Sequence, residues 1–148
     1  MRTTAASPFS FVLDNSVLCG WFLANQADGY TEAIAARLLE SEAVSPQLLQ
    51  LEFVNVLRTG CRRGSIPIQK AREIVDQVAA LPIRIDAAPP SPATLLALAL
   101  RSDLSSYDAL YLELALRLQL PIATQDGALS DGTKPLQPKV FTREQRAT

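Results

Sequence analysis

Short apolar runs alternate along the chain with longer segments in which apolar positions recur every three or four residues. The short runs predict strands and the longer segments predict helices. Predicted strands cover residues 9–13, 43–44, 83–85, 121–124 and 139–141. Predicted helices cover residues 17–24, 30–41, 45–59, 66–80, 93–101 and 106–118. Strands that alternate with helices indicate a parallel sheet covered on both faces, which is an α/β sandwich.

Serine and proline positions predict where two of these helices begin. Ser45 as N-cap, with Pro46 at the first helical position, starts a helix that ends at Gly60. Ser105 caps a later helix and puts Asp108 near its third position. An acid there can complete a capping box and complement the helix dipole, or it can be a metal ligand aimed into a pocket. The spacing alone leaves both roles open.

The composition is that of one folded domain. The 148 residues are 48% hydrophobic and 20% charged, and no apolar run approaches the roughly 20 residues that span a bilayer. Residues 1–8 lack the apolar core of a secretory signal, so we expect a flexible N-terminal extension and a cytoplasmic protein. Cys19 and Cys61 lack metal-ligand spacing and are expected to be reduced thiols.

The absence of histidine excludes several classes of mechanism. It rules out a Ser-His-Asp triad, a histidine general base and the usual nitrogen-ligated zinc sites. The formal net charge of −1 argues against a protein that coats nucleic acid through bulk positive charge. Catalysis would therefore rest on carboxylates, hydroxyls, lysine or arginine, and carboxylates suit hard cations best.

Several acids are placed to meet at the carboxyl edge of the predicted sheet. Asp14 directly follows the first strand, and Asp126 follows the strand at residues 121–124. Asp108 heads the helix that leads into that same strand. Ligands of parallel α/β folds bind outside this edge. The edge is therefore the expected site.

Glu52 differs because it lies inside a helix, on the same face as Asn55. It can belong to a solvated face. The helix is so apolar, however, that we expect it to be largely buried, and a buried glutamate needs a partner. Glu52 is therefore a fourth candidate acid.

Four converging carboxylates favour a site for a divalent cation. Like charges raise one another's pKa unless a cation neutralises them, and Mg²⁺ or Mn²⁺ does so with oxygen ligands. Such a site supports phosphodiester hydrolysis, because the metal activates a water molecule and stabilises charge on the leaving oxygen. Ser16 and Thr124, each two residues from an acid, are candidate supporting groups.

Four motifs in register carry a resemblance to a known family. They are Leu13-Asp14-Asn15-Ser16, Pro46 with Glu52-x-x-Asn55-x-Leu57, Leu104-Ser105-x-Tyr107-Asp108-Ala109-Leu110-Tyr111, and Ala123-Thr124-x-Asp126-x-x-Leu129. With them the chain resembles a PIN-domain ribonuclease, specifically the VapC-type toxin of a VapBC toxin–antitoxin pair. The resemblance covers residues 9–141, nearly the whole chain.

The resemblance implies a fold, an activity and partners. It implies a three-layer α/β/α sandwich with a mainly parallel sheet of about five strands, formed by residues 9–142 as one PIN-like domain, with residues 143–148 as a tail. It implies a Mg²⁺-dependent endoribonuclease, with Mn²⁺ able to substitute, whose substrate is RNA. It also implies a cognate VapB-like antitoxin and a homodimer. The implied catalytic and metal-binding residues are Asp14, Glu52, Asp108 and Asp126, supported by Ser16, Asn55 and Thr124.

Two further features leave alternatives open. Arg62 and Arg63 belong to a basic group that is either an ordinary solvated patch or a contact for RNA phosphates near the pocket. Asp103 stands where small residues are common in such proteins, and we expect it to lie in a turn.

Three other function classes fit these residues less well than the ribonuclease. A PIN-fold interaction module without turnover would be free to lose the four acids, and all four are present. A haloacid-dehalogenase-like phosphatase needs a second aspartate where Ser16 stands. A phosphoacceptor receiver needs an acidic pair and a late lysine, and neither is evident. The sequence therefore favours the enzyme.

Overall fold

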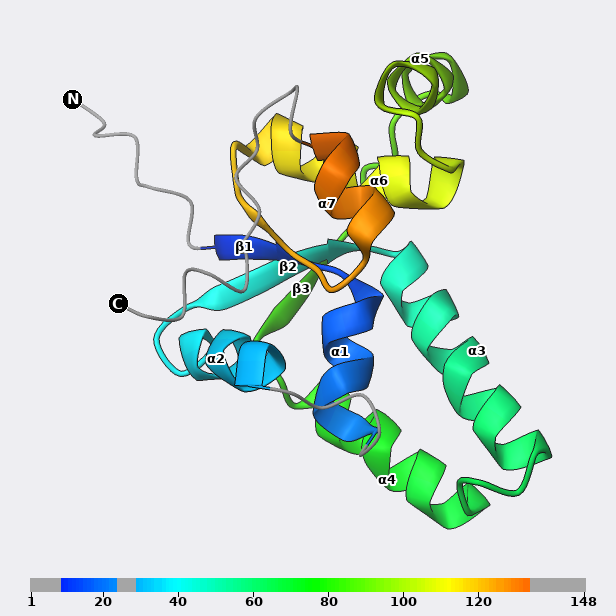
Figure 1. Ribbon diagram of the computed structural model, residues 1–148. Coiled ribbons are helices and arrows are strands. Elements are labelled where there is room, and N and C mark those ends of the chain that lie inside the picture. Colours follow the sequence, from blue (N-terminus) through cyan, green and yellow to red (C-terminus); the bar gives the residue numbers. More distant parts are fainter. Residues whose placement is uncertain (1–8, 24–28, 134–148) are drawn as a thin grey trace.

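The computed structural model describes residues 9–23 and 29–133 of the chain (Figure 1). In chain order its elements are β1 (Phe9–Leu13), α1 (Asn15–Phe22), α2 (Gly29–Arg37), β2 (Glu42–Pro46), α3 (Leu48–Arg62), α4 (Ile68–Ala79), β3 (Ile83–Asp86), α5 (Pro92–Ser102), α6 (Ser106–Leu118), β4 (Ile122–Ala123) and α7 (Gly127–Thr133). The predicted alternation of strands and helices is confirmed. None of the described helices is both long and apolar enough to cross a membrane.

The described strands form one parallel sheet of four strands in the order β3-β2-β1-β4. The predicted fold class, an α/β sandwich with a parallel sheet, is confirmed, with four strands where about five were expected. The predicted strand at residues 139–141 lies outside the described residues, as do the extension at 1–8 and the tail at 143–148.

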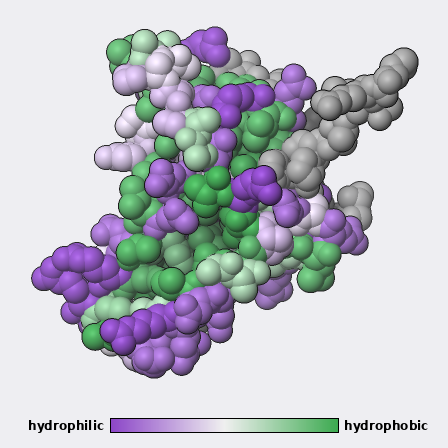
Figure 2. Space-filling view, turned by 180° about the vertical axis from the view of Figure 1, so that it is seen from behind, coloured by the Kyte–Doolittle hydropathy of each residue, from purple (hydrophilic) through white to green (hydrophobic). Residues whose placement is uncertain are grey.

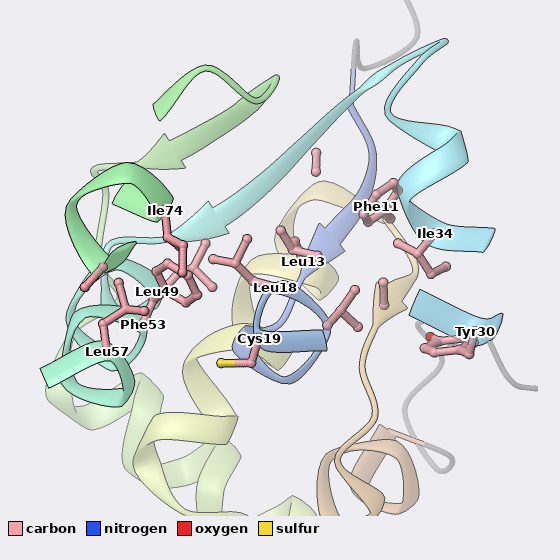
Figure 3. Close-up of a cluster of buried hydrophobic side chains, with 14 residues drawn as sticks. Phe11, Leu13, Leu18, Cys19, Tyr30, Ile34, Leu49, Phe53, Leu57 and Ile74 are labelled. Carbon is pink, nitrogen blue, oxygen red and sulfur yellow. The ribbon is translucent and has the colours of Figure 1, made fainter. Parts of the chain in front are cut away.

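Alternate residues of the central strand β1 point into two separate hydrophobic cores. Phe11 and Leu13 pack against α1, α2, α3 and α4 on one face of the sheet (Figure 3). Val12 packs against α5, α6 and α7 on the other face. Since successive side chains of a strand point to opposite faces, this burial on both sides explains why the strands read as continuous apolar runs. The result is the predicted three-layer arrangement (Figure 1).

The strand order creates a switch point beside β1. The chain passes from β1 to β2 to β3 on one side and then returns to place β4 on the other side of β1. At such a point two neighbouring strands lead into helices on opposite faces, which leaves a crevice at their carboxyl ends. Asp14 follows β1 and Thr124 follows β4, so both lie at the switch point.

The predicted helix start at Ser45 and Pro46 is wrong. Both residues are buried at the end of β2. Helix α3 begins only at Leu48. The Ser45 hydroxyl donates to the carbonyl oxygen of Leu13 at 2.6 Å, so it joins β2 to the end of β1 instead of capping a helix. A serine–proline pair is consistent both with the start of a helix and with the end of a strand. Here the neighbouring strand β1, which accepts the Ser45 hydrogen bond, determines that the pair ends β2.

Other element boundaries also differ from the prediction. Helix α3 runs to Arg62 and does not end at Gly60, and α2 ends at Arg37 before a turn. Helix α7 was not predicted. The expectation that α3 is largely buried is also wrong, because the side of α3 that carries Leu51 and Val54 leaves them 67% and 54% exposed.

Hydrophobic side chains also gather in a hollowed patch seen from behind the molecule (Figure 2). Between α3, α4 and β3 lies a hollow of about 360 Å³ with mostly apolar walls, including Phe53, Val75 and Ile83. Exposed Val54 of α3 lines this hollow, whereas Leu51 does not.

Candidate active site

Asp14 is the buried acid at the centre of the site. It directly follows β1, and its backbone N–H donates to the Ala123 carbonyl of β4 at 3.0 Å. It is the N-cap residue of α1, yet its side chain makes no capping bond. Instead the hydroxyls of Ser16 and Thr124 both donate to its Oδ2, each at 2.7 Å. With only 5% of the residue exposed, these two donors hold the carboxylate in place.

Ser16 and Thr124 connect Asp14 to the loop that follows β4. The Thr124 hydroxyl accepts from the backbone N–H of Asp126 at 2.9 Å, and the Ser16 hydroxyl accepts from that of Gln125 at 2.8 Å. Each hydroxyl therefore donates to the buried carboxylate and accepts from the loop. Two of the three supporting residues suggested by the sequence, Ser16 and Thr124, therefore lie at the site.

Asp126 and Asp108 are carried by the starts of helices. The Asp126 carboxylate accepts from the Leu129 N–H at 3.0 Å, as an N-cap of α7 does. In α6, the Ser105 hydroxyl accepts from the Asp108 N–H at 3.1 Å, which confirms the predicted cap. Ser105 therefore caps the helix, and Asp108 is only partly buried. The two roles suggested for this segment are compatible.

Glu52 reaches the site from α3 and is held by Tyr111, which the sequence analysis names within a motif but gives no role at the site. The Tyr111 hydroxyl donates to Glu52 Oε1 at 2.6 Å, although 59 residues separate the two in the chain. Tyr111 is fully buried in α6. Two features of the sequence indicate it: its place at the end of the motif from Leu104 to Tyr111, and its position three residues after Asp108 on the same helix face.

A second tyrosine closes the site from α2. The buried Tyr30 hydroxyl accepts from the backbone N–H of Thr124 at 3.2 Å. The neighbouring Thr31 carbonyl accepts from the Trp21 indole at 2.6 Å, which fixes α2 against α1. Helix α2 thereby contributes to holding the end of β4.

Burial raises the pKa of the Asp14 carboxyl above its ordinary value. The hydrogen bonds from Thr124 and Ser16 favour the charged form and offset part of this effect. The charge of Asp126 then raises the Asp14 pKa further. A buried carboxylate with two donors and a nearby negative charge is one that a cation would stabilise.

The other acids also lie within electrostatic reach of one another. Burial is the main cause of the raised pKa of Glu52, and the charges of the other three acids add to it. At Asp108, burial is followed by the charges of Asp126 and Asp14. Burial and the charges of Asp14 and Glu52 raise the pKa of the Cys19 thiol to about 11. The four predicted acids therefore share one negative region.

Without metal, we expect the protein to be more stable at about pH 5 than at about pH 7. Carboxyls whose pKa is raised on folding bind more protons when folded, so the free energy of unfolding falls as pH rises from the unfolded pKa through the folded pKa. Thermal melts in a chelator at both pH values measure this. The asparagine side chain of Asp14→Asn cannot ionise, so this variant should show a smaller difference in melting temperature between the two pH values. A difference as large as in the wild type would contradict the raised pKa of Asp14.

The side chains at this site have the donor atoms that a hard cation such as Mg²⁺ prefers. Every side chain gathered here offers oxygen, as Mg²⁺ requires. In residues 9–23 and 29–133, however, no group of three or more Cys, Asp or Glu side chains is placed to hold a metal ion together. A cation here would accordingly use one or two carboxylates with several waters, which is the usual coordination of Mg²⁺ in proteins.

Three of the predicted residues are not brought to the acids. Asn55 is exposed on α3, and the hydrogen bonds of the described residues do not join it to any of the four acids. Arg62 ends α3, and Arg63 follows it as the C-cap; both are exposed. Ten residues of helix put Arg62 about 15 Å from Glu52 along the helix axis. Asp103 is the C-cap of α5 with φ 52°, which confirms the expected turn.

Known proteins are similar to this chain in sequence or in fold. The PIN domain profile matches residues 11–134. Ribonuclease VapC1 of Mycobacterium tuberculosis, from strains CDC 1551 / Oshkosh and ATCC 25618 / H37Rv, is 36% identical over 102 residues, or 66% of this chain and 74% of the relative. The crystal structure of PAE2754 from Pyrobaculum aerophilum matches with a TM-score of 0.65 and 24% identity, over 88% of this chain and 84% of that chain. The last match supports the fold alone.

Proposed function

The chain belongs to the PIN-domain family and is related to VapC-type ribonucleases, and on this basis we propose that it is a Mg²⁺-dependent endoribonuclease that acts as the toxin of a toxin–antitoxin pair. The observation that carries the proposal is the placement of Asp14. Its buried carboxylate lies at the switch point, held by two hydroxyls, within electrostatic reach of the other three acids.

The acids and the hydroxyls of the site would have different roles in the proposed reaction. One or two of the four carboxylates, Asp14, Asp108, Asp126 and Glu52, would bind the cation directly, and the others would act on it through bound waters. When bound, Mg²⁺ supplies Lewis acidity and neutralises charge at an RNA phosphodiester. Ser16 and Thr124 orient the Asp14 carboxylate, and they also bind the backbone of the loop after β4, so that the carboxylate and the loop are held together. This pre-organisation lowers the cost of reaching the geometry for hydrolysis.

The proposal includes partners. The relation to ribonuclease VapC1 supports an RNA substrate and a cognate VapB-like antitoxin that would cover the acidic site. It also includes a homodimer and a cytoplasmic location. Mn²⁺ would substitute for Mg²⁺, since both are hard cations that take oxygen ligands.

Cleavage of RNA that depends on added metal is the test of the proposed activity. Single-stranded RNA incubated with the purified protein should be cut with Mg²⁺ or Mn²⁺ and left intact in a chelator. Saturating metal should also raise the melting temperature at about pH 7, because it binds the folded acids and relieves their repulsion. Asp108→Asn should remove most cleavage. Metal-independent cleavage would overturn the mechanism, and no cleavage with any metal would favour the non-catalytic interaction module.

Arg62 and Arg63 provide a separate test of how RNA is held. Arg63 and Lys70 line a hollow of about 520 Å³ at the α3–α4 end of the molecule, and Arg62 directly precedes Arg63 at the end of α3. If Arg62 and Arg63 contact phosphates, charge reversal of both to Glu should weaken RNA binding by roughly 10-fold and make it less dependent on salt. Glu73→Lys, an exposed reversal on α4, is the control. An unchanged salt dependence in the double variant would leave the patch as ordinary solvated surface.

A further inference from the structure

The bond between Tyr111 and Glu52 joins two helices whose main packing partners, apart from β2, are different. Helix α6 packs mainly on α5, α7 and the strands, and α3 packs mainly on α1, α4 and β2. Against this background the Tyr111 hydroxyl donates to Glu52 Oε1 at 2.6 Å. Such a short bond from a hydroxyl to a carboxylate is charge-assisted, and it fixes the position of the accepting oxygen.

The Tyr111 hydroxyl is not needed for the packing that the aromatic ring provides. The whole residue is buried, and a phenylalanine would fill the same volume without a polar atom. A buried hydroxyl is costly unless it is bonded, and the partner that the structure gives it is Glu52. Glu52 by contrast is only partly buried, on a flexible side chain with three torsions, so without the bond it could turn toward water.

The same face of α6 therefore places two of the four acids. Tyr111 lies three positions after Asp108, which puts the two side chains on one face of the helix. Asp108 takes its position from α6 directly. Glu52 takes its position from α6 through Tyr111, and only one of its two oxygens is used for this bond. Oxygen Oε2 is left for another partner.

We propose that Tyr111 is a positioning residue of the ribonuclease, whose hydroxyl holds the Glu52 carboxylate of α3 in register with the acids at the switch point. This rests on the proposed function for its effect on RNA cleavage. Its effect on the acidic site itself does not require that function.

Tyr111→Phe tests the proposal because it removes the hydroxyl and keeps the ring. We expect kcat for RNA cleavage to fall about 10- to 100-fold with KM changed less than about 3-fold, since a small misplacement of a reacting group has effects of this size. The affinity for Mn²⁺, measured by calorimetry, should fall several-fold. Tyr107→Phe, an exposed tyrosine on the same helix, is the matched control and should change neither quantity.

A double variant separates positioning from general support of the fold. If Tyr111 acts through Glu52, Tyr111→Phe should have little further effect on kcat or on Mn²⁺ affinity in a Glu52→Gln background. Equal effects in both backgrounds would overturn the proposal, as would a Tyr111→Phe protein with wild-type kcat and Mn²⁺ affinity. If the wild type cleaves no RNA, the proposed function fails, and the Mn²⁺ affinities of the four proteins still decide whether Tyr111 positions Glu52.

Discussion

Asp14→Asn is expected to lower RNA cleavage by about 10²- to 10⁴-fold, the range found when a group that acts in the transition state is removed. The variant keeps the shape of the side chain and an oxygen that can accept from Ser16 and Thr124. It loses the negative charge that would hold the cation. RNA cleavage rates at saturating Mg²⁺ measure the effect.

The stability of the same variant shows whether the loss is chemical. Because burial raises the pKa of Asp14, removal of its charge should leave metal-free thermal stability unchanged or raise it. The gain in melting temperature on adding Mg²⁺ should shrink. Asp76→Asn, an exposed change of the same kind on α4, is the control and should match the wild type. An Asp14→Asn protein that cleaves RNA within a few-fold of the wild type would remove Asp14 from the active site.

Thr124→Val is expected to lower both stability and cleavage. The methyl group that replaces the hydroxyl can neither donate to Asp14 nor accept from the Asp126 N–H. Two polar groups then lose a partner at a buried position, at a cost of about 2–4 kcal/mol. Cleavage should fall by roughly 10-fold or more, because the carboxylate and the loop lose their connection. Chemical unfolding and cleavage rates measure the two effects.

Thr124→Ser is the matched control for that change. It keeps the hydroxyl and loses only a methyl group, so the bonds to Asp14 and Asp126 can form as in the wild type. We expect a much smaller loss of stability than in Thr124→Val, about 1 kcal/mol, and nearly wild-type cleavage. If serine and valine had the same effect, the hydroxyl would not be what connects the two acids.

Some of the site could be predicted because its signals are local. Ser105 and Asp108 lie within one helical turn, and the cap between them depends on backbone geometry that any chain shares. Asp14 directly follows β1, Asp126 comes three residues after the end of β4, and the carboxyl ends of parallel strands share one edge. The alternation of strand and helix patterns likewise predicts the α/β class.

Ser45 shows where such local signals fail. Serine followed by proline is as consistent with a helix start as with the end of a strand, and the two differ only in what lies alongside. In the fold the Ser45 hydroxyl meets the Leu13 carbonyl, 32 residues earlier in the chain. The exposed apolar side of α3 was mispredicted for a similar reason: hydrophobic residues alone do not reveal which neighbours are present to cover them.

The sequence by itself determined the alternating elements, the acids at the ends of two strands and at the start of a helix, and the motifs that indicate the family. Only the tertiary structure decided the order of the strands, the bonds from Ser16 and Thr124 to Asp14, and the contact of Tyr111 with Glu52. The physical reason is the distance along the chain over which each interaction acts. Helix and strand periods and caps act within a few residues, whereas these contacts join groups up to 110 residues apart that meet only when both faces of the sheet are buried.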